Sequence, residues 1–148
     1  MENLMLMLGW AGLYAPMALG SLGSILGCSL AGQAACGALV ETDTGHGRYI
    51  GISAMPSSQS IFGIVVMFSL NRELSIANAP GIAAIGLLCG AALLVSGIYQ
   101  GRCCAAAINV SRIKPEIFGL SLAPAAIVEG FAVFVFIFAL VLSGSLPA

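Results

Sequence analysis

The sequence has very little charge. Only 7% of its residues are Asp, Glu, Lys or Arg, whereas 59% are hydrophobic, and the mean hydropathy is +1.06. A chain of 148 residues with so few charges cannot cover a soluble domain with polar surface. The sequence therefore predicts an integral membrane protein. It contains no basic patch, which argues against nucleic acid as a partner.

Catalytic and metal-binding motifs are also missing. The chain has no glycine-rich nucleotide loop and no nucleophile motif, so any ATP chemistry would belong to a partner and this chain is expected to be non-catalytic. The one histidine, His46, is expected in a solvated loop, and the five cysteines lack metal-ligand spacing. We expect the cysteines to be small packing residues rather than a disulfide framework.

The few charges divide the chain into four apolar runs, at residues 5–39, 50–70, 79–109 and 117–143. A helix needs about 20 apolar residues to cross a bilayer core. The sequence thus predicts an all-α membrane protein with four transmembrane helices, of which the first and third are long enough to tilt or protrude. No basic residue precedes Arg48, so we expect the first helix to be retained rather than cleaved as a signal peptide.

Basic residues in the short loops predict the orientation. Arg48, Arg112 and Lys114 follow the first and third helices, whereas the middle loop holds only Arg72. Because cytoplasmic loops are enriched in Lys and Arg, we expect a multi-pass protein of the cell membrane with both hairpin loops cytoplasmic and the termini external.

The two halves of the chain look like copies of one hairpin. Residues 32–38 resemble residues 101–107 at an offset of 69, and Pro56 and Pro124 both lie early in their spans. Such repeats are common in membrane transport proteins. We predict two transmembrane hairpins, the first at 1–73 and the second at 74–148.

Small and bulky residues fall on alternate helices. Small residues let helix backbones approach closely in lipid, so the glycine-rich first and third helices are expected to form a crowded layer, and the bulky second and fourth to face lipid. The glycines in question are Gly9, Gly12, Gly20, Gly23, Gly27, Gly32 and Gly37, then Gly81, Gly86, Gly90, Gly97 and Gly101.

Glu129 is the only charged residue in the apolar run 122–142. A carboxylate at the centre of a spanning helix costs roughly 2.5 to 3.5 kcal/mol on insertion scales. Glu129 should therefore be protonated, paired or bound to a cation, and an ionisable group at this depth indicates a functional site.

Uncharged oxygen donors are predicted close to Glu129. Gln100 and Glu129 each lie 14 residues from the turn at Lys114 and Pro115, or about 21 Å at 1.5 Å per residue. Ser57, Ser58 and Gln59 follow Pro56 at a comparable position, and Pro56 frees a backbone carbonyl. These hard oxygen ligands suit a small cation such as Na⁺. Gln59 and Gln100 could instead hydrogen-bond a protonated carboxyl.

Residues 55–63, Met-Pro-Ser-Ser-Gln-Ser-Ile-Phe-Gly, resemble the Pro-Gly-Thr-Gln-Gly-Leu-Tyr-Gly stretch of the proteolipid K (c-type) subunits of bacterial V-type ATPases. Gln100-Gly101, the Lys114-Pro115-Glu116 loop and Glu129 complete the pattern. The resemblance implies a ring of identical subunits that turns against a stator subunit with an essential arginine and is joined to a central stalk. It also implies sodium ligands, namely Ser58, Gln59, Gln100, Glu129 and the carbonyl of Met55, with Pro56 and Phe62 around them.

Two departures from the family pattern stand out. Phe62 replaces a tyrosine whose hydroxyl would hold the glutamate, and Ser57 takes the place of a glutamate in the first hairpin. One ion per chain follows, carried on Glu129 during ATP-driven rotation or its reverse. The same rotor carrying H⁺ and a non-rotary tetraspan transporter or scaffold are the alternatives.

Overall fold

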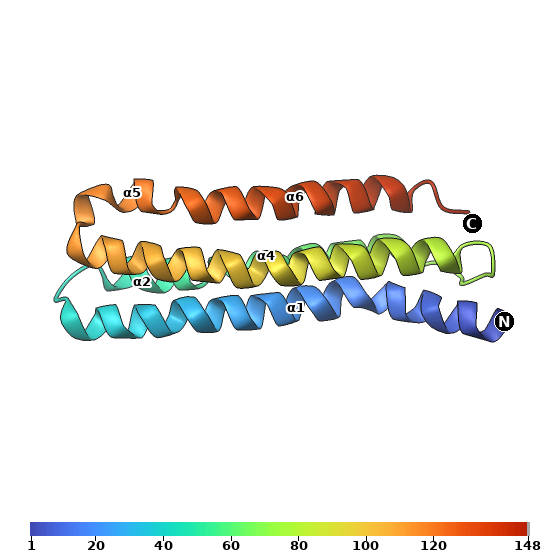
Figure 1. Ribbon diagram of the computed structural model, residues 1–148, viewed down its shortest axis with the longest axis horizontal. Helices are drawn as coiled ribbons and strands as arrows, with labels where there is room; N and C mark the ends of the chain where they lie inside the picture. Colours follow the sequence, from blue (N-terminus) through green and yellow to red (C-terminus); the bar gives the residue numbers. More distant parts are fainter. Residues whose placement is uncertain (148) are drawn as a thin grey trace.

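The structure, a computed structural model, describes residues 1–147 and forms four antiparallel spans with no strand in that range (Figure 1). The first span is α1 (Glu2–Glu41), and the third is α4 (Ala79–Ile113). The second and fourth spans are interrupted: they consist of α2 (His46–Ser53), η1 (Met55–Ser57) and α3 (Ser58–Leu70), then η2 (Pro115–Ile117), α5 (Phe118–Ser121) and α6 (Ala123–Ser143). The four predicted transmembrane helices are confirmed.

The helices run past the apolar limits seen in the sequence. α1 has 40 residues and α4 has 35, so at 1.5 Å per residue they are about 60 and 52 Å long, against a bilayer core of about 30 Å. The two hairpin turns lie at one end of the bundle, with the middle turn and both termini at the other (Figure 1). The long helices therefore extend beyond the span that a membrane would cover.

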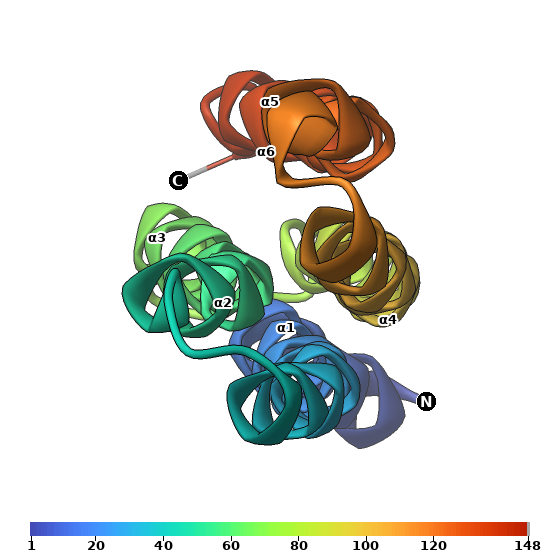
Figure 2. The same cartoon turned by 90° about the vertical axis from the view of Figure 1, so that its left-hand side faces the viewer.

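The glycines of α1 and α4 bring these two helices into backbone contact. A Cβ atom at Gly86 would meet the carbonyl of Gly12, and one at Gly97 or Gly101 would meet the backbone of the α1 glycine opposite, Gly23 or Gly27. The end view shows α1 against both α3 and α4, with α6 on the far side (Figure 2). The predicted crowded layer is confirmed.

Four of the twelve predicted glycines do not belong to that layer. A Cβ at Gly20 would meet the backbone of Gln59 on α3, and one at Gly81 would meet Leu146. A Cβ at Gly32 or Gly37 would have no atom within 4 Å, because the last turns of α1 present these positions away from the neighbouring helices. Composition predicted the contact layer, but which glycines enter it depends on the rotation of each helix.

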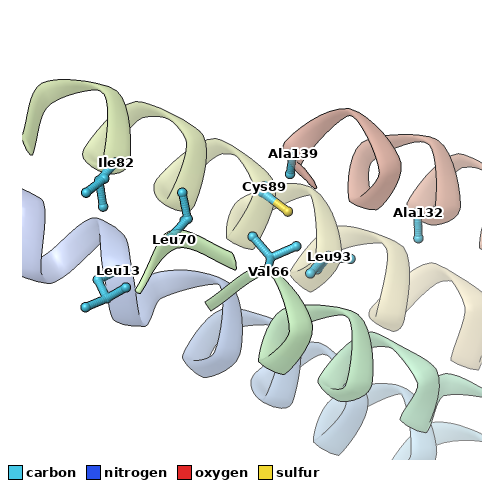
Figure 3. Packing of buried hydrophobic residues seen from close by; sticks show 8 residues of the cluster. All are labelled: Leu13, Val66, Leu70, Ile82, Cys89, Leu93, Ala132 and Ala139. Carbon is cyan, nitrogen blue, oxygen red and sulfur yellow. The ribbon is translucent and has the colours of Figure 1, made fainter. Parts of the chain in front are cut away.

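Bulky side chains of α3 and α6 point both inward and outward. Ile61, Phe68 and Phe131 are exposed, as expected for lipid-facing residues, whereas Val66 is fully buried. An apolar cluster joins all four spans (Figure 3). It consists of Leu13, Val66, Leu70, Ile82, Cys89, Leu93, Ala132 and Ala139. Cys89 packs there as a small apolar residue, as predicted.

Candidate functional site

The second span breaks at Pro56, where a 3₁₀ turn separates α2 from α3. The hydroxyl of Ser24 on α1 donates to the carbonyl of Pro56 at 2.7 Å and accepts from the amide of Ser60 at 3.0 Å. These are the two groups that an unbroken helix would pair with each other, so Ser24 inserts into the hydrogen-bond ladder of the span. Sequence reasoning missed Ser24, whose only signal is a hydroxyl within a glycine-rich stripe.

The side chains of Gln59 and Gln100, both predicted to lie near Glu129, meet each other in the interior. Nε2 of Gln59 donates to Oε1 of Gln100 at 3.1 Å, and both side chains are 0% exposed. The other two amide atoms, Oε1 of Gln59 and Nε2 of Gln100, are buried with no hydrogen-bond partner. Since buried polar atoms are nearly always satisfied, the pair has spare capacity for a ligand. A carbonyl oxygen has two lone pairs, so Gln100 can also accept again.

Two further oxygen donors lie where the 3₁₀ turn becomes α3. The hydroxyl of Ser58 donates to the carbonyl of Met55 at 3.2 Å. A hydroxyl that donates its proton still has lone pairs with which to bind a cation. The sequence-predicted donors Met55, Ser58 and Gln59 are thus grouped within one turn, and Gln100 contacts the last of them.

Glu129 projects from α6 and is partly exposed. Ser96, one turn before Gln100 on α4, donates its hydroxyl to the carbonyl of Val128 at 3.3 Å. The sequence placed Gln100 and Glu129 equally far from the loop at Lys114 and Pro115, but the backbone of Glu129 lies about one helical turn further from that loop than the backbone of Gln100. The 3₁₀ and bent segments at 115–122 account for the difference, because they are not regular α-helix. The side chains of a helix lean toward the N-terminus of that helix. Because α4 and α6 are antiparallel, the side chains of Gln100 and Glu129 lean in opposite directions along the bundle, which brings their ends to more similar depths.

Phe62 faces α6 rather than a polar group. Its ring stacks on that of Phe136 with centroids 5.0 Å apart and 27° between the planes. Such a pair contributes roughly 0.5 to 1.5 kcal/mol beyond the burial of its area. Where a tyrosine would present a hydroxyl, Phe62 therefore offers an apolar contact that holds α3 against α6. Pro56 is buried against Gly27 of α1.

Comparison with known proteins agrees with this arrangement. The family model of the ATP synthase C subunit matches the chain twice, over residues 11–70 and 83–142. The matched segments begin 72 residues apart, rather than the 69 estimated from the small-residue stretches, and each covers one hairpin. The two hairpins are therefore copies of one unit.

Two relatives extend the comparison. The chain is 32% identical over 129 residues to the A-type ATP synthase subunit K of Methanocaldococcus jannaschii, covering 84% of this chain and 59% of that protein's length. It is 30% identical over 128 residues to the V-type sodium ATPase subunit K of Enterococcus hirae, covering 82% of each. With both hairpins matched by the family model, the chain belongs to the ATP synthase C-subunit family and resembles the membrane proteolipids of A-type and V-type ATPases.

Proposed function

We propose that the chain is a rotor-ring subunit that carries Na⁺ across the membrane on Glu129. The observation that carries this proposal is the buried Gln59–Gln100 pair, in which Oε1 of Gln59 has no hydrogen-bond partner and can bind a cation. Leaving a buried polar atom without a partner costs about 1 to 3 kcal/mol. A cation held by Glu129, Gln59, Gln100, Ser58 and the Met55 carbonyl would use the spare oxygen capacity and neutralise the carboxylate.

The choice of Na⁺ over H⁺ follows from the number and type of donors. A proton on Glu129 needs one acceptor at most, whereas this site offers two amide oxygens, a hydroxyl and a backbone carbonyl. Hard oxygen donors of this kind suit a small alkali or alkaline-earth cation, and a single carboxylate favours a monovalent one. The sodium ATPase named among the relatives supports the same choice.

Assembly into a ring is supported by the outer face of the chain. Members of the family form rings, and an apolar groove of about 460 Å³ runs along α4 and α6. It is lined by residues such as Leu88, Phe134 and Phe138, which are large, exposed and apolar. A neighbouring copy would cover this groove with its α1 and α3. A head-to-tail contact between identical subunits closes into a ring when the rotation from one subunit to the next is a whole fraction of a full turn.

In the working enzyme, rotation would bring each Glu129 to an arginine of a stator subunit, whose positive charge would displace the ion. Moving one charge through 100 mV is worth about 2.3 kcal/mol, so several ions can be coupled to one ATP. The hairpin loops would face the cytoplasm and the central stalk, because they hold Arg48, Arg112 and Lys114.

Carbodiimide labelling of the purified ring tests the proposal. Sodium should slow the modification of Glu129 at fixed pH, because a bound ion occupies the carboxylate. Labelling that depends on pH but is indifferent to sodium would leave the ring as a proton carrier. A monomer or dimer in mild detergent, with no sodium-resistant ring on a gel, would reject the rotor altogether and favour a non-rotary tetraspan protein.

A further inference from the structure

A small polar cavity lies at the hairpin-turn end of the bundle, away from Gln59, Gln100 and Glu129. It has a volume of about 120 Å³ and is enclosed by the end of α1, the start of α2, the end of α4 and the start of η2. It is lined by Thr42, Thr44, Gly45, Arg48, Tyr49, Ser111, Arg112 and Pro115. Two arginines and four hydroxyl side chains line the cavity, and no acidic side chain does.

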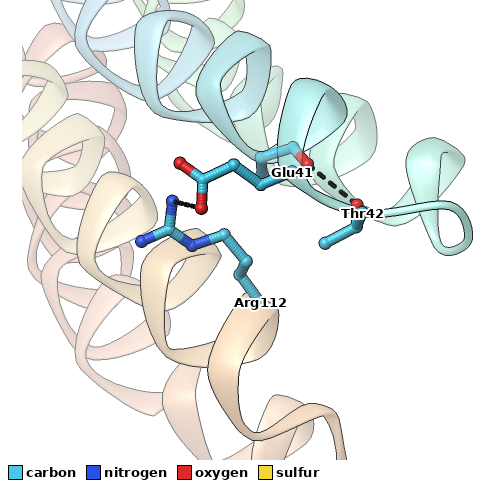
Figure 4. Close-up of polar contacts among 4 residues, drawn as sticks. Glu41, Thr42 and Arg112 are labelled. Carbon is cyan, nitrogen blue, oxygen red and sulfur yellow. Dashed lines mark hydrogen bonds and ion pairs between the residues drawn. The ribbon is translucent and has the colours of Figure 1, made fainter.

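The two arginines differ in how their charge is balanced. Nη1 of Arg112 pairs with Oε2 of Glu41 at 2.6 Å, and Glu41 itself is exposed outside the cavity (Figure 4). Arg48 donates to the hydroxyl of Ser111 at 3.4 Å and lies over the ring of Phe118 at 4.7 Å, both neutral partners. Within residues 1–147 no carboxylate pairs with Arg48. The cavity therefore has an uncompensated positive charge.

Neutral donors complete the cavity wall. Tyr49 lines the cavity and is only 3% exposed. The phenol end lies beside Gly45, which adopts the left-handed conformation at φ 83° and precedes the first turn of α2 without a side-chain cap.

We propose that this cavity binds one phosphate group, either free inorganic phosphate or the phosphodiester of an anionic lipid. Arg48 supplies the charge-assisted hydrogen bonds, since its planar fork of donors matches phosphate oxygens. The Tyr49 hydroxyl supplies a neutral one, and because Glu41 balances the charge of Arg112, the net positive charge at the cavity is that of Arg48. The small volume limits the occupant to a single phosphate-sized group, so only the head of a lipid would enter.

Purified rings test the proposal in two arms. One arm measures radiolabelled inorganic phosphate by equilibrium dialysis, and the other counts phosphatidylglycerol retained per chain after reconstitution and mild detergent washing. Arg48→Gln should weaken binding about tenfold or more in whichever arm shows it, because it removes charge-assisted hydrogen bonds. Lys114→Gln is the matched control: it removes one exposed positive charge at the same end but does not line the cavity.

The outcomes separate the possibilities. Binding in the first arm identifies free phosphate, and binding in the second alone identifies the lipid. Equal losses in Arg48→Gln and Lys114→Gln would reduce the effect to surface charge and overturn the proposal, as would no binding in either arm. A third outcome would also overturn the proposal. If no phosphate binds and the Arg48→Gln ring no longer holds the soluble ATPase subunits, the cavity receives an acidic side chain of a partner instead.

A milder variant covers the case in which Arg48→Gln does not assemble. Tyr49→Phe removes one hydroxyl and should weaken phosphate binding about threefold to fivefold, in line with a neutral hydrogen bond. Tyr14→Phe, exposed on α1 outside this cavity, is its control. Unchanged phosphate binding in Tyr49→Phe would contradict the assigned role of the hydroxyl. If Arg48→Gln does not assemble, the same result would contradict the proposal itself.

Discussion

α3 after Pro56 and α6 after Pro124 descend from copies of the same hairpin, yet they are held very differently. Around Pro56 the backbone is bound by Ser24, and Gln59 is completely buried. α6 has its proline in the first helical turn and is the least buried of the four spans, with Glu129 partly exposed. One copy became an interior support and the other an outer helix.

This difference suggests how a site can be both organised and reachable. Neutral ligands that stay in place are best held on well-packed backbone, where little entropy is lost when an ion binds. In the proposed rotor the carboxylate would meet both the ion and the stator, so an exposed helix suits it. Five substitutions test this division, starting with the largest expected effect.

Glu129→Gln should abolish the function assigned to the exposed helix. The amide is nearly the same size but has no negative charge, so ion transport by reconstituted enzyme should fall to background. Sodium uptake into proteoliposomes measures this. Glu73→Gln, on the middle turn, is the control and should transport normally. Full transport by Glu129→Gln would remove the proposed carrier.

Gly86→Ala should disrupt the close contact between α1 and α4, against which α3 and α6 pack. The added methyl group would meet the backbone of Gly12, and forcing extra atoms into a packed interior costs about 1 to 3 kcal/mol or more. We expect less ring on a gel and a lower melting temperature. Gly32→Ala, where nothing lies within 4 Å, should behave as the unmodified chain. Equal losses from the two variants would contradict the contact.

Gln59→Leu should weaken ion binding at the buried Gln59–Gln100 pair while leaving Glu129 in place. It removes one proposed ligand and leaves the Gln100 amide buried without its donor, at a cost of about 1 to 3 kcal/mol. The sodium concentration that protects Glu129 from carbodiimide should rise about 5-fold to 100-fold. Gln33→Leu, an exposed glutamine of α1, should leave protection unchanged. Unaltered protection in Gln59→Leu would exclude Gln59 as a ligand.

Ser24→Ala tests whether the broken backbone positions the ligands. Without the hydroxyl, the Pro56 carbonyl and the Ser60 amide lose their shared partner. We expect protection to need about five times more sodium, which corresponds to one neutral hydrogen bond. The half-maximal concentration should shift while the amount of ring stays constant. A lower ring yield with normal sodium affinity would make Ser24 purely structural. Ser29→Ala is the exposed control.

Phe62→Tyr should have the smallest effect and would restore the hydroxyl that the resembled family has. The ring already stacks on Phe136, so the phenol needs little rearrangement. A new hydrogen bond to Glu129 would lower the sodium needed for protection by about fivefold or less. Phe68→Tyr, exposed on the same helix, controls for the added hydroxyl. No difference between the two would mean that the residue at 62 does not hold the glutamate.

Much of the fold could be predicted because its causes are local. Charges interrupt the apolar runs, so the four spans were predicted to within a few residues. Pro56, which was expected to free a backbone carbonyl, lies in a 3₁₀ turn. Gln59 and Gln100 were each expected near the depth of Glu129, because both are polar residues at similar distances from the hairpin turns. Ser24 and Ser96 could not be found this way, since a hydroxyl in an apolar helix has many possible partners and only packing selects one.

By itself the sequence determined the membrane class, the four helices and the isolated carboxylate of Glu129, and it predicted the oxygen donors proposed to surround that carboxylate. These follow from composition and from the free energy of placing polar groups in hydrocarbon. The tertiary structure decided which α1 glycines touch α4, that Ser24 bridges the break at Pro56, and that Val128 lies level with Ser96. Those contacts depend on the rotation and relative shift of whole helices, which are fixed only when several helices pack together.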